Sequence, residues 1–261
     1  MKNILVPTDL SDEGKAALEV GMAMAKSLNG HVTLLHIIDA PNAVDLGTQG
    51  QSSGSSIDQI FTLKLIERMK ANLAVAVEPY GDDAPLTAEM AIGNLIEKIN
   101  ERVAIDNIDL VIMGTKGADG MHEVMVGSNA EKVVRNAHCP VLTVKKSATN
   151  VHPNNIAFAS DFTENDQLGQ IVPRLQAFQK QYGAKLHLVY VNTPNRFEHT
   201  SYSTKRMKNF VNKYGIENYT INIYNHRDEE DGILCFADEN NMDMIAVATH
   251  SRKGLAHLLS G

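Results

Sequence analysis

The sequence predicts an α/β protein built from two tandem domains, each a doubly wound open parallel sheet. Two observations carry this prediction: strands alternate with helices along the chain, and the second part of the chain repeats the first. The length of 261 residues alone allows one large domain or two modest ones. Hydrophobic residues make up 43% and charged residues 21%, close to the globular average, which excludes disordered, collagenous and coiled-coil chains.

Three pairs of similar segments, in the same order in both copies, establish the repeat. In the first pair, residues 4–11 match residues 156–163 at an offset of 152. The offset is 154 in the second pair and 134 in the third, so the second copy has a shorter connection between them. We therefore expect domain 1 at residues 1–147 and domain 2 at residues 153–261. The second and third pairs are 31–38 with 185–192 and 109–115 with 243–249.

Each predicted element of the first copy has a local reason. Nearly continuous apolar runs predict strands buried on both faces of a parallel sheet, and a period of 3.6 residues predicts the helices between them. Ser11 is the expected N-cap of the first helix, and Asn29-Gly30 is its expected C-terminal stop. The predicted strands are 3–8, 31–38, 85–91, 109–114 and 140–145, and the predicted helices are 12–28, 58–77, 94–104 and 128–137.

Charge and composition exclude several classes of function. The net charge of −7 argues against a nucleic-acid-binding protein, which usually carries a basic excess. No apolar run approaches the roughly 18 residues of a membrane-spanning helix, and Pro7 interrupts the apolar stretch that a signal peptide would need. Cys139 and Cys235 are too few for a disulfide scaffold. The sequence therefore predicts a cytoplasmic protein without affinity for membranes or nucleic acids.

A glycine pattern after the fourth predicted strand is the main chemical signal. It reads Gly114-x2-Gly117-x9-Gly127-Ser128, which places a glycine loop between a strand and the N-terminus of a helix. A helix N-terminus presents unpaired N–H groups and a partial positive charge, and glycines let the backbone approach a phosphate closely. The pattern therefore predicts a nucleotide or phosphate site. The alternative is a turn followed by a capping box, because Ser128 to Glu131 fits S-x-x-E.

Four segments together resemble the universal stress protein family. They are residues 6–9, residues 36–39, the glycine pattern and the last strand at 139–144. The resemblance covers the chain as a tandem pair and implies a five-stranded Rossmann-like fold of the adenine nucleotide alpha hydrolase type. It also implies that the first copy binds ATP, ADP or AMP, with Mg²⁺ or Mn²⁺. The implied nucleotide-binding residues are Pro7, Thr8, Asp9, Ile37, Met113, Gly114, Gly117, Gly127, Ser128 and Asn129.

The resemblance also implies roles for individual residues. Asp9 would meet the ribose or adenine side and Ile37 would pack on adenine, while the glycines, Ser128 and Asn129 would surround the phosphates. The family loop often has a basic residue just after the second glycine, where this chain has Ala118 and Asp119. An acidic side chain beside a triphosphate lowers affinity unless a divalent cation bridges the two, so we expect such a cation.

The second copy departs further from the glycine pattern. Ala248 and Ser251 stand in place of the first two glycines, Arg252 adds a cation, and Gly261 aligns with the third glycine. We expect this second site to be degenerate or to serve another ligand. The helix from 128 and the strand at 140–145 have no counterpart in the second copy, which predicts a truncated sequence or a strand supplied by another chain. The expected second site comprises Ser160, Asp161, Val191, Ala248, Ser251, Arg252 and Gly261.

The leading functional hypothesis is a nucleotide-binding module that regulates or protects during stress. The copies would pack as an internal pseudo-dimer, with further homodimerisation and a protein partner that the sequence does not name. A slow ATPase or phosphotransferase is one alternative, although Thr8-Asp9 lacks a visible acid or base partner, and a nucleotide-free interaction protein is another. For His250 and His257 we favour ordinary polar histidines over metal ligands. Residues 42–56 form either a mobile tract or a lid.

Overall fold

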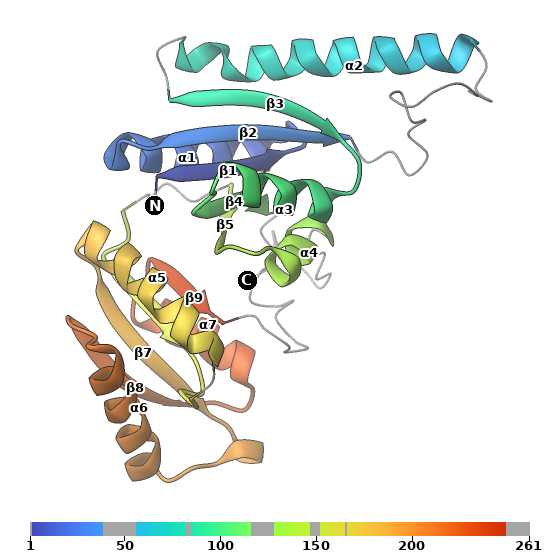
Figure 1. Cartoon of the computed structure of the whole chain (residues 1–261). Coiled ribbons are helices and arrows are strands. Elements are labelled where there is room, and N and C mark those ends of the chain that lie inside the picture. Colours follow the sequence, from blue (N-terminus) through green and yellow to red (C-terminus); the bar gives the residue numbers. More distant parts are fainter. Residues whose placement is uncertain are drawn as a thin grey trace. The chain divides into compact units, whose positions relative to one another are not determined.

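The computed structural model describes residues 2–38, 56–81, 85–115, 128–146, 152–164 and 166–248. The chain separates into two compact units, Met1–Thr149 and Asn150–Gly261, which are described one at a time (Figure 1). The elements of unit 1 are β1 (Asn3–Thr8), α1 (Asp12–Leu28), β2 (His31–Ile38), α2 (Ser56–Val77), η1 (Glu78–Tyr80), β3 (Leu86–Ile92), α3 (Leu95–Ile105), β4 (Leu110–Thr115), α4 (Ser128–Asn136) and β5 (Val141–Lys145).

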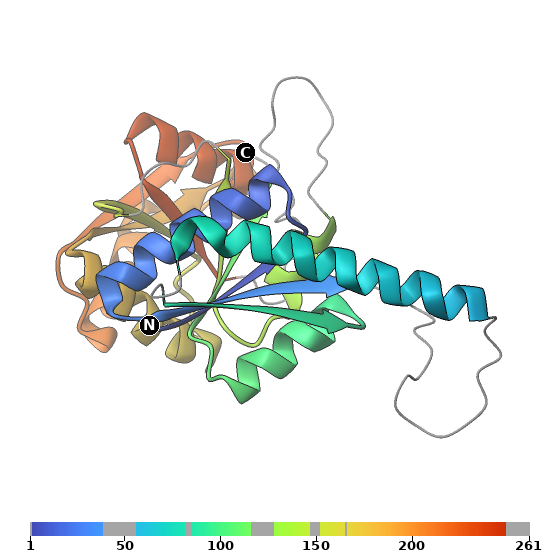
Figure 2. The same ribbon diagram turned by 90° about the horizontal axis from the view of Figure 1, so that it is seen from above.

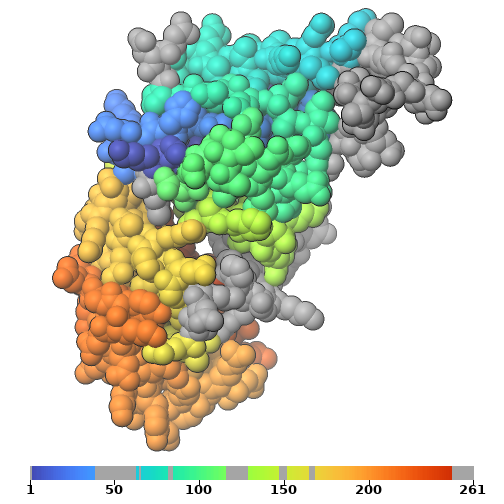
Figure 3. All heavy atoms as spheres, in the orientation of Figure 1, coloured from blue at the N-terminus to red at the C-terminus, as the bar shows by residue number. Residues whose placement is uncertain are grey.

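Unit 1 is a five-stranded parallel sheet with the strand order β3-β2-β1-β4-β5. The chain moves outward from β1 to β3, returns to β4 beside β1, and continues outward to β5. Right-handed crossovers therefore place α1 and α2 on one face and α3 and α4 on the other. Figure 2 shows this arrangement, with the strands between α1 and α3. α2 packs along the edge strand β3, as the surface view in Figure 3 also shows.

Each face of this sheet is covered by its own set of buried side chains. On one face, Leu5 and Val111 pack with Ile99 of α3, and all three are almost completely buried. On the other face, α1 comes so close to the sheet that a Cβ atom added at Gly21 would lie 3.1 Å from Cγ2 of Val6. Burial of each such aliphatic side chain contributes about 1.5–3 kcal/mol, so these central strands hold the unit together.

The first helix shows how local signals set its limits. The side chain of Ser11 accepts a hydrogen bond from the N–H of Gly14 at 3.2 Å, and α1 begins at the next residue, Asp12. At the other end, Asn29 adopts the left-handed conformation with a φ of 48°, and the N–H of Gly30 donates to the carbonyl of Ala25. The predicted fold class, a parallel-sheet α/β fold in two domains, is confirmed.

Unit 2 repeats this architecture with a four-stranded parallel sheet in its described residues. Its strand order, β8-β7-β6-β9, matches the order β3-β2-β1-β4 of unit 1. The expectation of a missing helix and strand concerns the chain after Ala248, which lies outside the described residues. The elements are β6 (Asn155–Ala159), α5 (Asp166–Tyr182), β7 (Lys185–Asn192), η2 (Pro194–Arg196), α6 (Thr200–Tyr214), β8 (Tyr219–Asn225), α7 (Glu229–Glu239) and β9 (Met244–Val247).

The two faces of the unit 2 sheet differ in composition. Ala157, Val189 and Phe236 belong to the cluster that packs beneath α7. The other face contains aromatic rings, with Phe158 and Phe210 stacked at a centroid distance of 6.2 Å. No helix in the described parts of the chain combines the length and the apolar character needed to cross a membrane.

Candidate functional site

The loop after β1 is a tight turn held by its own side chains. The N–H of Leu10 donates to Oγ1 of Thr8 at 2.9 Å, and the N–H of Ser11 donates to Oδ1 of Asp9 at 3.0 Å. Leu10 has a φ of 64°, which is an unfavourable left-handed conformation for a leucine. The two side-chain hydrogen bonds hold this strained backbone, and the turn fixes Asp9 at the carboxyl end of the central strand.

Unit 2 contains the same turn with different residues. The N–H of Phe162 donates to Oγ of Ser160 at 3.1 Å, and the N–H of Thr163 donates to Oδ1 of Asp161 at 3.0 Å. Phe162 also adopts the left-handed conformation, with a φ of 53°. The repeat seen in the sequence therefore extends to backbone conformation, and the predicted residues Ser160 and Asp161 occupy the positions of Thr8 and Asp9.

The carboxylate of Asp9 is held in its charged form. Partial desolvation would raise its pKa, but hydrogen bonds from the hydroxyl and the N–H of Ser11, together with the nearby His36, lower the pKa below its usual value. Nδ1 of His36 donates to the carbonyl of Thr8 at 2.8 Å, which ties the end of β2 to the end of β1. Asp9 is therefore an exposed, ionised hydrogen-bond acceptor at this edge of the sheet.

Pro7 lies where the hydrogen-bonded pairing of β1 with β4 ends. The carbonyl of Asn3 accepts from the N–H of Asp109 at 2.9 Å, so Asn3 faces β4. Successive residues of a strand face alternate neighbours, so Leu5 and Pro7 face β4 as well. Proline has no N–H to donate, and the pairing of these two described strands stops at Leu5 with Val111. These unpaired strand ends, here called the opening, lie where the strand order reverses, the usual ligand position in such sheets.

The strands at the same position in unit 2 remain paired. Ala159 stands where unit 1 has Pro7, and it faces β9 because Asn155, four residues earlier, accepts from the N–H of Asp243 on that side. The pairing of β6 with β9 extends to Ala159 with Val247, at the ends of both strands. The two units therefore differ at the switch point because Ala159 has an N–H to donate to the neighbouring strand and Pro7 has none.

Gly114 has a structural role that is independent of any ligand. A Cβ atom added to it would lie well under 3.0 Å from the backbone carbonyl of Glu13, in the first turn of α1. A Cβ atom added at Gly14 would lie 2.6 Å from Oγ1 of Thr8. These two glycines let the first turn of α1 rest directly on the ends of β1 and β4. The first glycine of the sequence pattern is thus required by packing.

The structure brings several other predicted residues together near the opening. Ile37 is half-buried and packs against the cluster that contains Met113 and Ala130 of the first turn of α4. Asn129 is exposed in that same turn, and Ser128 is the first residue of α4. Gly117 and Gly127 lie outside the described residues.

The capping-box alternative involves Glu131, whose carboxylate has another partner. Its Oε1 accepts from Nε of Arg135 at 2.9 Å, one turn further along α4. This is an ordinary i,i+4 ion pair on the helix surface, of the kind that adds a few tenths of a kcal/mol. A capping box and a phosphate site both remain predictions for the role of Ser128.

In unit 2 the predicted residues Asp161 and Val191 line a pocket of about 390 Å³. Glu198, Arg206 and Glu229 also line it, so charged side chains surround the carboxyl ends of β6 and β7. Ala248 directly follows β9, while Ser251, Arg252 and Gly261 lie outside the described residues.

An ion-pair network in unit 2 was not predicted from the sequence. Nη1 of Arg206 lies 2.8 Å from the carboxylate of Glu198, which also accepts from Oγ of Ser203 at 2.9 Å. The guanidinium lies over the ring of Tyr190, 4.9 Å from its centroid. The spacing of Glu198 and Arg206 gave a weak signal, since eight residues separate them and a loop joins the first to α6.

Unit 2 is expected to lose stability in acid through Glu198. The hydrogen bond from Arg206 lowers the pKa of Glu198 below its ordinary value of 4.5, and Ser203 adds to this effect against desolvation. A pKa that is lowered in the folded state stabilises the fold at pH values above the ordinary pKa of 4.5. This stabilisation is lost as the pH falls through the lowered pKa. At pH 6 the amide protons of α6 should be better protected from exchange in wild type than in Glu198→Gln. This difference in protection should narrow below about pH 4.5 as the pH is lowered to 3.

A matched control for this experiment is Glu217→Gln. Glu217 is exposed in the same unit and forms no ion pair with the described residues. The exchange of α6 in this variant should follow the wild-type pH profile. A difference in α6 protection between Glu198→Gln and wild type that stays constant across the whole pH range would contradict the stabilising role assigned to ionised Glu198.

The folds and the switch-point geometry define a class: a tandem pair of Rossmann-like α/β domains, the first with an opening beside its central strand. The sequence profile of the universal stress protein family matches residues 1–145, and the chain belongs to that family.

Individual relatives match one or both units. A universal stress protein of Methanocaldococcus jannaschii is 34% identical over 145 residues, which cover 56% of this chain and 82% of that protein. A universal stress protein of Synechocystis is 22% identical over 278 aligned positions, which cover 100% of this chain and 94% of that protein. A solved universal stress protein from Archaeoglobus fulgidus has the same fold, with a TM-score of 0.65 at 20% identity, covering 94% of this chain and 86% of that one.

Proposed function

We propose that unit 1 binds ATP or a related adenine nucleotide, and that binding tunes a stress-response regulatory or protective role. The observation that carries this proposal is the opening between β1 and β4, which Pro7 creates beside Asp9. Open parallel sheets bind ligands beyond the carboxyl ends of their strands at such a reversal of strand order. Membership of the universal stress protein family supports the same conclusion.

The described residues around the opening suit the parts of an adenine nucleotide. Ile37 and Met113 offer an apolar surface for the base, since they belong to one packed cluster. The ionised carboxylate of Asp9 can accept hydrogen bonds from ribose hydroxyls. The N–H groups in the first turn of α4, at Ser128 and Asn129, suit phosphate oxygens. The bound nucleotide would supply anionic phosphate oxygens, and Mg²⁺ or Mn²⁺ would offset their charge.

Calorimetric titration with ATP·Mg²⁺ tests this proposal. We expect one nucleotide per chain, and we expect Asp9→Asn to weaken binding by about tenfold, because it removes a charge-assisted hydrogen bond. Asp161→Asn is the matched control, since it makes the same change in the same turn of unit 2. Gly117→Glu and Gly127→Glu should abolish binding by placing a carboxylate in the phosphate loop.

Two outcomes would overturn the proposal. One is the absence of heat with the wild-type chain, measured on protein from which bound small molecules have been removed. The other is equal binding by Asp9→Asn and Asp161→Asn, with both glycine variants still active in binding. Either result would favour an interaction protein without a nucleotide.

A further inference from the structure

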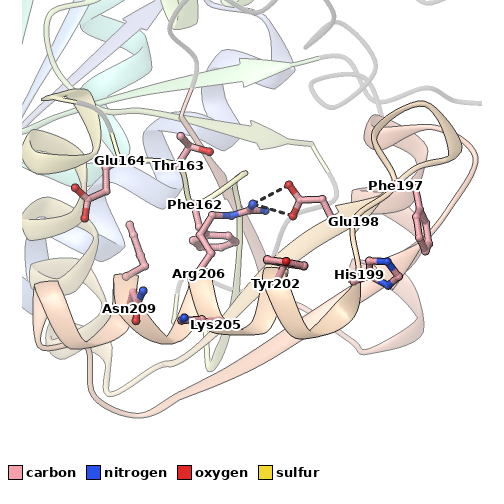
Figure 4. Close-up of a pocket in the computed structure, with 11 residues that line it drawn as sticks. Phe162, Thr163, Glu164, Phe197, Glu198, His199, Tyr202, Lys205, Arg206 and Asn209 are labelled. Carbon is pink, nitrogen blue, oxygen red and sulfur yellow. Dashed lines mark hydrogen bonds and ion pairs between the residues drawn. The ribbon is translucent and has the colours of Figure 1, made fainter.

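Unit 2 contains a second, larger pocket on the side of its sheet that faces α6. It has a volume of about 590 Å³, within the range of small-molecule sites. Its walls come from the turn after β6, the segment after η2, and one side of α6 (Figure 4). The pocket shares Thr163, Phe197, Glu198 and Arg206 with the smaller pocket at the ends of β6 and β7. The Arg206–Glu198 ion pair therefore forms part of the wall of both pockets.

Aromatic rings surround this pocket, and two of them are unusually exposed. Phe197 is 68% exposed and Tyr202 is 69% exposed, although rings of this size bury large apolar areas when they find a partner. His199 lies between them, with ring centroids at 5.9 Å from Phe197 and 6.4 Å from Tyr202. The inner wall contains the buried ring of Phe162. A planar apolar group can therefore be contacted from the rim and from the interior.

The charges in the pocket favour a single negative charge on the ligand. Glu198 is paired with Arg206, and Glu164 is paired with Lys213 at 3.0 Å. Lys205 lines the pocket and has no ion-pair partner among the residues that the structure describes. Its exposed ammonium therefore points to an acceptor supplied from outside, and the guanidinium of Arg206 adds positive charge to the same wall of the pocket.

We propose that this pocket binds a small aromatic carboxylic acid. The ring would lie against Tyr202 and Phe162, and the carboxylate would accept a hydrogen bond from the ammonium of Lys205. A polyphosphate fits less well, because the carboxylates of Glu164 and Glu198 also line the pocket. This site lies in unit 2 and is independent of nucleotide binding in unit 1.

The absence of tryptophan from the chain allows a direct test. Indole-3-propionate is an aromatic carboxylate whose indole fluorescence can be excited without a contribution from protein tryptophan. Its anisotropy should rise on titration with the full chain, because the complex is much larger than the free probe. The neutral indole-3-propionamide should bind about tenfold more weakly, since it lacks the charge that Lys205 would contact.

Variants on exposed positions locate the probe without unfolding the protein. Lys205→Met and Tyr202→Ser should each weaken binding by about tenfold. Lys208→Met, exposed on the same helix, and Tyr219→Ser, exposed on β8, lie outside the pocket and should leave binding unchanged. Equal binding by Lys205→Met and Lys208→Met, or by the acid and the amide, would overturn the proposal, as would no rise in anisotropy.

Discussion

Replacing Gly114 with alanine is expected to lower the free energy of unfolding of unit 1 by about 1–3 kcal/mol, the usual cost of overpacking a close-packed site. The added Cβ would lie well under 3.0 Å from both the carbonyl oxygen and the carbonyl carbon of Glu13. These are backbone atoms in the first turn of α1, so no side-chain rotation removes the clash. The helix must move away from the end of β4, and its contacts with the sheet weaken.

Native-state amide exchange in α1 and β4 measures this loss for unit 1 alone, which a single unfolding curve of a two-unit chain does not. Gly169→Ala is the control, because no described atom lies within 4 Å of a Cβ atom added there. Gly169 lies inside α5, and alanine is favoured over glycine in a helix interior by about 1 kcal/mol. We expect faster exchange in α1 of Gly114→Ala and slower exchange in α5 of Gly169→Ala. Similar changes in both variants would contradict the packing role of Gly114.

This role of Gly114 changes how the glycine pattern is interpreted. Packing requires the first glycine with or without a nucleotide, so the case for a phosphate loop rests on the other two glycines and on the opening beside Pro7. In unit 2, Ala248 stands at the position of Gly114. The starts of α1 and α5 are 154 residues apart, whereas Thr8 and Ser160 are 152 apart, so two extra residues precede α5. The two units therefore join their first helix to the sheet differently.

The sequence predicted the elements of unit 1 well because their signals are local. The predicted strand 31–38 coincides with β2, and the predicted helix 12–28 coincides with α1, whose ends are fixed by Ser11 and Asn29. The predicted helix 58–77 begins two residues late, since several serines stand at and before the start of α2 and the sequence does not single out one of them as the N-cap. The predictions for β3, α3, β4, α4 and β5 differ from the structure by one residue at one or both ends.

The features that the sequence did not reveal depend on how segments fold against one another. The Arg206–Glu198 pair forms only because α6 folds back beside the segment that follows η2. Pro7 was recognised as part of a motif, but its effect depends on which neighbouring strand its nitrogen faces. That direction follows from the pairing of Asn3 with Asp109, which are 106 residues apart in the chain.

Exchanging the residues at the two switch points, with alanine at position 7 and proline at position 159, is expected to reverse the difference in strand pairing between the two units. Pro7→Ala supplies an N–H that faces β4, so the pairing of β1 with β4 can extend toward Met113 and narrow the opening. We expect nucleotide affinity to fall by about tenfold while unit 1 gains roughly 0.5–1.5 kcal/mol, the net value of one hydrogen bond. Ala159→Pro removes the corresponding donor in unit 2 and should cost about 1–3 kcal/mol, because it leaves a half-buried acceptor on β9 unpaired.

Amide exchange in β4 and β9 reports the two changes separately, and titration with ATP·Mg²⁺ reports their effect on binding. The informative comparison is between affinity and stability in Pro7→Ala, because a simple packing defect lowers both, whereas closure of the opening lowers affinity and raises stability. If Pro7→Ala binds ATP as tightly as wild type while β4 exchanges more slowly, the opening exists but the nucleotide does not use it. If β4 exchange is unchanged, the missing N–H of Pro7 is not what ends the pairing, and the asymmetry between the units has another cause.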